Sequence, residues 1–248
     1  MIYLKSSSEI AIMRISGKIV AETLLKIEEI VRPGITTIEL DKIAEKYILS
    51  CGAIPSFKGL YGFPATLCTS VNEEVVHGIP GERVLQEGDI ISVDCGALYQ
   101  GFHGDAARTF PVGKITADNQ KLIDVTRQSF FEGVKFAIIG NRIGDIANAV
   151  QTYVENFGYG VVKDYVGHGI GKEMHEEPSV PNYGRIGRGP KLAKGMTIAI
   201  EPMVNLGTYA VTEQSDKWTV VTLDGKNSAH YENTIAILDN GPEILTII

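Results

Sequence analysis

Apolar and polar positions alternate with a helical period over the N-terminal part of the chain. Residues 6–9 (Ser-Ser-Ser-Glu) have the pattern of a capping box, in which two side chains bond free backbone N–H groups at a helix start. Apolar residues then recur as far as Val31, and Pro33 predicts the helix end. A second box at residues 36–39 predicts a helix that ends near Gly52. We expect its buried face to hold Leu40, Ile43, Ala44, Tyr47 and Ile48.

The period changes to that of β-strands in the middle of the chain. Residues 89–98 and 101–112 are apolar and β-branched, so we expect two strands joined by a tight turn. Helical patterns return at residues 116–138 and 144–157, and strand patterns predominate from there to the C-terminus. This order of elements predicts an α+β fold.

The two halves of the chain resemble each other. Two pairs of segments align at nearly one offset: residues 34–52 with 140–158, and residues 88–94 with 195–201. Both pairs include matched glycines, which mark backbone geometry and not only hydrophobicity. We therefore predict a single domain over residues 1–248 that arose by internal duplication, with halves of approximately 1–115 and 116–248 related by a pseudo-twofold axis.

The same alignment places Asp94 and Glu201 at equivalent positions, each at the end of an apolar strand. An ionised carboxylate in a covered sheet costs several kcal/mol unless it is paired or binds a cation. Asp105 and Glu232 also lie within strand patterns, and none of the four has an obvious basic partner. Four carboxylates balance the charge of two divalent cations, so we predict two metal ions about 3.5–4 Å apart.

Composition narrows the classes of partner. A net charge of -7 with scattered basic residues argues against nucleic acid. No segment reaches the roughly 20 apolar residues that span a bilayer, and the N-terminus lacks the pattern of a signal peptide. Cys51, Cys68 and Cys95 are odd in number, which favours free thiols in a reducing compartment. We expect a cytoplasmic protein without a membrane partner.

The five histidines divide into two groups. His103 and His230 are interpreted as packed or hydrogen-bonded structural residues. His168 is flanked by glycines that allow a close backbone approach, which favours a functional role. We predict functional roles for His77 and His175 as well.

Together these segments closely resemble the bacterial type I methionine aminopeptidases, which have the pita-bread fold. The motifs that carry the resemblance are residues 70–74, 76–80, 94–97, 101–105, 167–171, 175–178, 199–203 and 218–220. The resemblance covers essentially the whole chain and implies two pseudo-twofold-related halves with a central antiparallel sheet covered by helices. Glu201 and Glu232 lie too close in sequence for the helical insertion of type II enzymes.

The resemblance also implies a set of metal ligands. The ligand positions of the family match Asp94, Asp105, His168, Glu201 and Glu232. They imply two divalent ions, with Co, Mn, Fe or Zn all compatible with the donor set. Asp94 would bind one ion, His168 and Glu201 the other, and Asp105 and Glu232 both. One departure is Asn233, where relatives often have histidine.

The implied activity is removal of the N-terminal methionine from peptides and nascent proteins that have a small second residue. Glu201 would handle protons, His175 would stabilise the oxyanion and His77 would contact the scissile amide nitrogen. The methionine pocket maps onto Phe63, Cys68, Met174 and Trp218. Phe57 and Leu60 are neighbours for which core packing is the favoured interpretation. The implied partners are peptide N-termini and the ribosome exit region, for a monomeric enzyme.

Two alternatives remain open on sequence alone. A proline-directed aminopeptidase of the same superfamily usually carries an additional N-terminal domain, for which the chain has no length. A metal-free binding module would have lost ligands, whereas all five positions hold competent residues.

Overall fold

Capping boxes begin the first two helices, as predicted. In the computed structural model, which describes residues 1–248, α1 (Ser7–Ile30) has Ser6 as its N-cap and α2 (Thr37–Ser50) has Thr36. In each box the N-cap hydroxyl accepts from a backbone N–H of the first turn, and a glutamate accepts from the N-cap N–H in return. Both helices are therefore fixed at their starts by local sequence alone.

The third and fourth helices lie in the second half of the chain. They are α3 (Ala117–Val134) and α4 (Ile143–Glu155), and a short 3₁₀ turn, η1 (Leu60–Gly62), lies in the first half. The predicted helix over 116–138 was too long. The chain turns after Val134, where Ala137 donates to the Val134 carbonyl at 2.9 Å and becomes buried. The apolar residues beyond the turn continue the helical pattern without continuing the helix.

The buried face of α2 differs from the prediction at two positions, because Tyr47 is only partly buried and Ile43 is exposed. Ile43 is 39% exposed, whereas the neighbouring Asp41 is buried. The carboxylate of Asp41 accepts hydrogen bonds from the backbone N–H groups of Thr66 (2.9 Å) and Leu67 (2.8 Å). The hydrogen bonds of Asp41 thus orient α2 so that Asp41 faces the core, where hydrophobicity alone predicts Ile43.

All strand pairings are antiparallel, which confirms the α+β class. The first sheet has the order β1-β4-β2, with β5 on β4, and a five-stranded sheet has the order β15-β14-β9-β7-β8. Two smaller sheets have the orders β13-β10-β6 and β11-β12-β3. The strands of the first half are β1 (Ile54–Pro55), β2 (Leu67–Val71), β3 (Glu74–Val76), β4 (Ile90–Tyr99) and β5 (Phe102–Pro111). The others are β6 (Gly160–Val161), β7 (Gly167–Gly169), β8 (Glu176–Val180), β9 (Thr197–Ile200), β10 (Met203–Asn205), β11 (Val211–Glu213), β12 (Val220–Thr222), β13 (Ser228–His230), β14 (Asn233–Leu238) and β15 (Gly241–Ile244).

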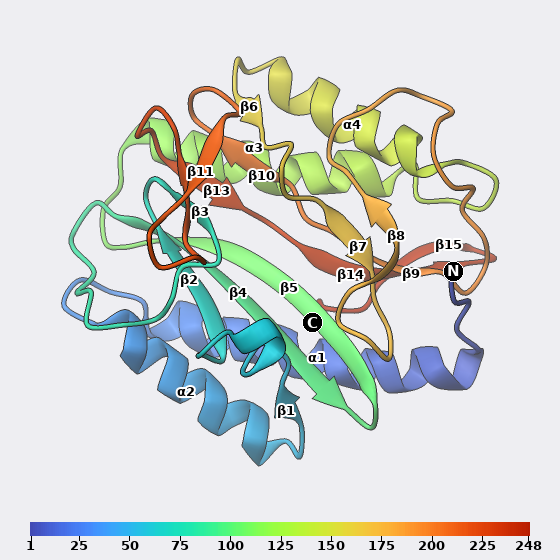
Figure 1. The fold of residues 1–248 in the computed structure, drawn as a ribbon, viewed down its shortest axis with the longest axis horizontal. Helices are drawn as coiled ribbons and strands as arrows, with labels where there is room; N and C mark the ends of the chain where they lie inside the picture. Colours follow the sequence, from blue (N-terminus) through green and yellow to red (C-terminus); the bar gives the residue numbers. More distant parts are fainter.

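Each pair of long helices covers the outer face of a different sheet (Figure 1). Val93 and Cys95 of β4 belong to the core cluster that includes the apolar faces of α1 and α2. Ile198 and Ile200 of β9 belong to a second cluster with residues of α3 and α4. Because side chains alternate along a strand, Asp94 and Ala199 point to the opposite, inner faces.

The two largest sheets meet at one point through backbone and side-chain hydrogen bonds. Ala107 of β5 and Glu232 exchange N–H···O bonds of 3.4 and 3.0 Å. The Thr234 hydroxyl accepts from the Asp105 N–H at 3.0 Å and donates to its carbonyl at 2.9 Å. This junction fixes the distance between acids that come from opposite halves of the chain. No helix in the structure has the length and apolar character needed to cross a membrane.

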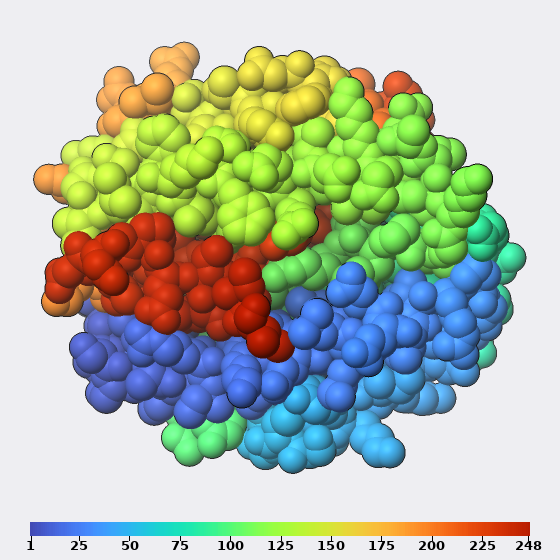
Figure 2. Space-filling model, turned by 180° about the vertical axis from the view of Figure 1, so that it is seen from behind, coloured from blue at the N-terminus to red at the C-terminus, as the bar shows by residue number.

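Figure 2 shows the C-terminal segment against the N-terminal part of the chain on the back of the molecule. Within α1, Gly17 is the residue that this segment approaches closely. A Cβ atom there would lie 2.2 Å from the carbonyl oxygen of Leu245. Alanine favours a helix interior over glycine by about 1 kcal/mol, so a loose contact would make Gly17→Ala stabilising. We expect Gly17→Ala instead to lower the free energy of unfolding by about 1–3 kcal/mol in urea titrations.

Lys18→Ala is the control for this substitution, because Lys18 is exposed and lies 3.8 Å from Glu22 in a weak surface pair. It should change the free energy of unfolding by less than about 0.5 kcal/mol. A gain in stability for Gly17→Ala would contradict the close packing of the C-terminal segment on this helix.

Candidate active site

A cleft with a volume of about 580 Å³ opens on the inner faces of the sheets. It gathers the five predicted metal ligands, together with the predicted catalytic and pocket residues His77, His175, Phe63, Cys68 and Trp218. Met174 does not line the cleft; it is buried in the apolar cluster that contains Phe63 and Cys68. Phe57 and Leu60 line the cleft and also pack in or against that cluster. The favoured interpretation of these two as core residues was therefore incomplete.

Asp94 and Asp105 lie on the same face of the first sheet. In the β4–β5 register Asp94 is opposite Ala107, and Asp105 is opposite Gly96, which makes the two acids diagonal neighbours. Cys68 of β2 lies directly across from Asp94 on its other side. The sheet itself therefore places these three side chains at the floor of the cleft.

The second sheet supplies the other acids and an imidazole. Continuing the β9–β14 register by one residue sets Glu201 opposite Glu232. Nε2 of His168, on β7, lies 3.6 Å from Oε1 of Glu201 and 3.8 Å from Oδ2 of Asp105. The Nδ1 of His168 donates to the Gly169 carbonyl at 2.8 Å, which leaves Nε2 with its lone pair toward the acids.

The acids are buried together without a basic partner. Burial raises the pKa of Asp94 to about 7. Burial, followed by the charges of the other acids, raises the pKa values of Asp105, Glu201 and Glu232 well above their usual range. One carboxylate oxygen each of Asp94, Asp105 and Glu232 is buried with no hydrogen-bond partner. Such a cluster needs a cation, because leaving it unpaired costs several kcal/mol for each charge.

The donor atoms are arranged closely enough to hold metal ions. One group consists of Asp105, His168 and Glu232, and a second of Glu201, His230 and Glu232; in each, the donor atoms lie within 4.8 Å of one another. Asp94 belongs to neither group, although its charge raises the pKa values of both Asp105 and Glu201. Oxygen and imidazole donors of this kind fit divalent transition metals.

Two further histidines approach this cluster from the rim. The ring of His175 lies 4.5 Å from that of His168 between centroids and stacks on Tyr61 at 5.9 Å. The ring of His77 lies edge-on to Tyr165 at 5.4 Å. Burial lowers the pKa of His77 to about 4 and also lowers the pKa of His175, so both are neutral at neutral pH.

His77 is presented by a tight turn directly after β3. Its φ is 61°, in the left-handed region that few side chains adopt. The next residue, Gly78, lies so close to β2 that a Cβ atom would be 2.1 Å from the carbonyl oxygen of Thr69. The Thr69 N–H donates to the Gly78 carbonyl at 2.8 Å, which fixes the backbone beside His77.

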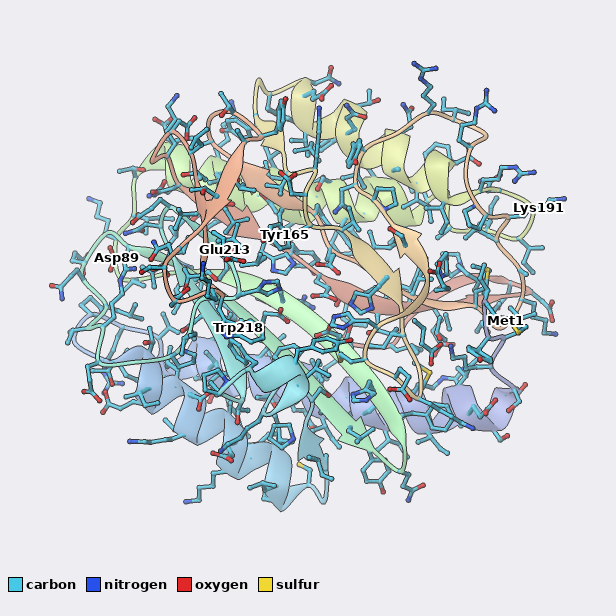
Figure 3. The ribbon with its side chains drawn as sticks, viewed as in Figure 1. Met1, Asp89, Tyr165, Lys191, Glu213 and Trp218 are labelled. Atoms are coloured by element: carbon cyan, nitrogen blue, oxygen red, sulfur yellow. The ribbon has the colours of Figure 1, made fainter.

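Among the aromatic and histidine residues that line the cleft, the sequence did not point to Tyr61 and Tyr165, and His230 was interpreted as structural. Tyr61 lies in the short turn η1 and Tyr165 lies in a loop. Figure 3 shows Tyr165 and Trp218 on loops over the central strands. Loop residues carry no periodic signal, so only their proximity to the motif histidines could have indicated them. His103 is a structural histidine as expected, since its Nδ1 bonds the Ser56 hydroxyl at 2.8 Å.

Asn233 belongs to a hydrogen-bond network behind the predicted metal ligands. Its side-chain oxygen accepts from Arg108 at 2.7 Å and from the Thr246 hydroxyl at 3.0 Å. Arg108 also donates to the backbone carbonyl of Glu232 at 2.5 Å. Asn233, the residue that departs from the histidine of the family pattern, therefore links the C-terminal segment and Arg108 to the backbone of Glu232, a predicted ligand.

This cleft, with its acids, imidazoles and antiparallel scaffold, is that of a metallopeptidase. The sequence model of metallopeptidase family M24 matches residues 11–239, so the chain belongs to that family. The chain is 65% identical over 248 residues to the methionine aminopeptidase of Clostridium acetobutylicum, covering 100% of this chain and 99% of that one. It is 54% identical over 246 residues to methionine aminopeptidase 1 of Bacillus subtilis, covering 99% of each.

The fold agrees with these relatives. The methionine aminopeptidase of Rickettsia prowazekii has a TM-score of 0.98 to this structure at 40% identity, with 100% of each chain covered. Within family M24 the chain therefore belongs to the bacterial type I methionine aminopeptidases, and the pita-bread fold is confirmed. It is a metal-dependent exopeptidase that removes the N-terminal methionine. These comparisons exclude the metal-free binding module.

The raised pKa of Asp94 makes the stability of the metal-free protein depend on pH. The folded protein keeps this carboxyl protonated at pH values where the unfolded chain releases the proton. Its contribution to stability is therefore full below the ordinary value of 3.8 and is lost as the pH rises through about 7. We expect the free energy of unfolding of metal-free wild type to fall, relative to Asp94→Asn, between about pH 4 and pH 7.

Urea titrations at each pH measure this difference, with Glu29→Gln as the control for the loss of one exposed acid from the surface of α1. The control profile should run parallel to that of wild type. If the Asp94→Asn profile also ran parallel to wild type, Asp94 would not be a buried carboxyl with a raised pKa.

Proposed function

We propose that the cleft is a dinuclear metal centre that removes methionine from peptides and nascent proteins, with a preference for a small second residue. The observation that carries the proposal is the cluster of four acids with raised pKa values and no Lys or Arg ion-pair partner, three of which have a buried carboxylate oxygen without a hydrogen bond. Two divalent ions would neutralise the four carboxylates. Co, Mn, Fe and Zn all suit such donors.

We assign the ligands as the family resemblance implies. Asp94 would hold one ion, His168 and Glu201 the other, and Asp105 and Glu232 both. Three features support the assignment: Asp105 lies beside Asp94 on the sheet and 3.8 Å from His168, and Glu232 belongs to both donor groups. When bound, the two ions would polarise the scissile carbonyl and lower the pKa of a water molecule between them.

The side chains around the cluster would carry out the proton transfers and the orientation. Glu201 would accept a proton from the attacking water and return it to the leaving amine, since its oxygens face the cluster. His175 is neutral, so its N–H can donate to the carbonyl oxygen as negative charge develops there. His77, held over the cleft, would contact the scissile amide nitrogen.

The acids at the floor of the cleft also explain why the enzyme acts at the N-terminus of its substrate. A free α-amine can lie against the acids and ions, whereas an internal peptide bond offers no basic nitrogen to this position. His77 and Tyr165 stand together at the rim, where the second residue of the substrate would pass. A small second residue would fit in this passage, which supports the proposed preference for Gly, Ala or Ser.

The first side chain would enter a pocket of aromatic rings and sulfur. Phe63 and Trp218 meet edge-to-face at 5.1 Å, and Cys68 lies beside Asp94 with its thiol kept neutral by a pKa that burial raises. A thioether gains about 0.3–1.5 kcal/mol from sulfur–aromatic contact and bends to fit such a pocket. Met174 would support the wall from the buried cluster. We further propose that the enzyme is a monomer in the cytoplasm and acts on nascent chains near the ribosome exit.

The roles of ligand and oxyanion donor can be separated by two substitutions. We expect His175→Ala to lower kcat by about 10²–10³-fold while the metal content stays near that of wild type, because one hydrogen-bond donor is lost. Asp105→Ala should lose metal as well as activity, because this residue would contact both ions. Elemental analysis of gently purified protein and hydrolysis of Met-Ala-Ser measure the two effects.

The reverse pattern would contradict the assignment. If His175→Ala lost its metal while Asp105→Ala retained both ions, the two residues would have to exchange roles. A chelated wild-type protein with unchanged activity would contradict the dinuclear centre itself.

The pocket residues should determine the preference for the first side chain. We expect wild type to cleave Met-Ala-Ser about 10–200-fold faster, in kcat/KM, than Leu-Ala-Ser, because a branched chain fills the pocket less well. Cys68→Ala and Trp218→Ala should reduce this ratio. Cys95→Ala is a matched control: Cys95 is one residue from Asp94 but lies on the opposite face of β4. The pocket would be misassigned if both pocket variants kept the wild-type ratio or if Cys95→Ala changed it.

A further inference from the structure

His230, at the end of β13, has a buried ring nitrogen that no hydrogen bond explains. The side chain is 2% exposed, and its Nε2 has no hydrogen-bond partner. A buried polar atom without a partner costs about 1–3 kcal/mol, so native structures rarely leave one unused. An imidazole nitrogen is also the commonest side-chain ligand of transition metals in proteins.

The surroundings of this nitrogen are those of a metal ligand. Nε2 of His230 lies 3.9 Å from Oε2 of Glu201 and 3.8 Å from Oε2 of Glu232. These distances exceed the 2.7–3.2 Å of a hydrogen bond, but donors about 2.0–2.2 Å from one ion can stand up to about 4.2 Å apart. Nε2 of His168, a predicted ligand, has nearly the same distances to its carboxylates, 3.6 and 3.8 Å.

The carboxylate of Glu201 lies between the two imidazoles. Its Oε1 faces His168 and its Oε2 faces His230. His230 also forms one of the two groups of donor atoms within 4.8 Å, together with Glu201 and Glu232. The two donor groups thus contain one imidazole each.

The backbone of His230 is fixed independently of any ion. Its N–H donates to the Thr109 hydroxyl at 2.9 Å, and that hydroxyl donates to the His230 carbonyl at 2.9 Å. His230 also pairs with Met203 in the β10–β13 register. His230 lines the cleft and also a second recess, which lies between α1 and α3 beside the C-terminal residues; Figure 2 shows the face on which this recess opens. The imidazole is therefore held in place, as a rigid ligand requires.

We propose that His230 is a sixth ligand of the metal centre and binds, through Nε2, an ion that Glu201 and Glu232 also hold. The proposal rests on the dinuclear function proposed above. A second imidazole makes the centre richer in nitrogen donors, which favours Fe²⁺, Co²⁺ and Zn²⁺ over Mn²⁺. The alternative is an Nε2–H that moves closer and donates a hydrogen bond to Glu201, without contact to the metal.

X-ray absorption spectroscopy of the Co²⁺-loaded protein separates these possibilities, because it counts the imidazoles bound to metal. We expect two imidazoles per wild-type protein and one in His230→Gln, whose amide can still donate to Glu201. His230→Gln should also bind Co²⁺ about 100-fold more weakly by calorimetry and Mn²⁺ about 10-fold more weakly or less. His103→Gln is the matched control, since His103 is another buried histidine of the neighbourhood that belongs to neither donor group.

One imidazole per protein in both wild type and His230→Gln, with both ions bound, would overturn the proposal and leave the dinuclear centre intact. Equal losses of affinity for Co²⁺ and Mn²⁺ would also overturn it. A wild-type protein that binds no divalent ion would instead overturn the proposed function itself. The wild-type spectrum decides the question even if His230→Gln folds poorly.

Discussion

The mutual repulsion of four buried carboxylates is the constraint on which the rest of the structure depends. Asp94, Asp105, Glu201 and Glu232 come from four different strands or strand ends, and burial raises each of their pKa values. A flexible scaffold would separate them or turn them to solvent. Two antiparallel sheets, each covered on its outer face by a pair of helices, hold them together instead. The packed core therefore holds the four carboxylates together at an electrostatic cost, which bound cations would reduce.

The junction of the sheets couples this cost to the fold. Ala107 and Glu232 join the sheets by backbone hydrogen bonds, and both flanking residues of the junction, Asp105 and Thr234, are bonded to each other. Arg108 holds the Glu232 carbonyl from behind, with Asn233 and the C-terminal segment as its further partners. Any movement that relaxed the acids would have to break these bonds. The geometry of the centre is thus fixed by groups that never touch the substrate.

Sequence predicted those features that local chemistry determines. Capping boxes gave both helix starts, and apolar strands ending in acids gave the positions of Asp94 and Glu201. The prediction was wrong where a residue distant in sequence determines burial. Asp41 is buried in place of Ile43 because two backbone N–H groups at the start of β2 donate hydrogen bonds to its carboxylate. Tyr61 and Tyr165 were not identified because a short turn and a loop carry no hydrophobic periodicity. The family resemblance placed Met174 in the pocket, whereas its side chain packs in the buried cluster with Phe63 and Cys68. The internal duplication remains a prediction.

His103 and His230 show why residue type alone could not settle the roles of the histidines. Both lie within strands, and both are buried. The Nδ1 of His103 forms a hydrogen bond with the Ser56 hydroxyl. Nε2 of His230 instead faces two carboxylates that lie beyond hydrogen-bond distance. The first half of the chain brings only oxygen donors to the cluster, through Asp94 and Asp105, and the second half brings the imidazoles. Under the proposed ligand assignments the two ions would therefore occupy unequal sites. The site near Asp94 would be the harder, oxygen-rich one, and the site between His168 and His230 would be the one that selects the metal.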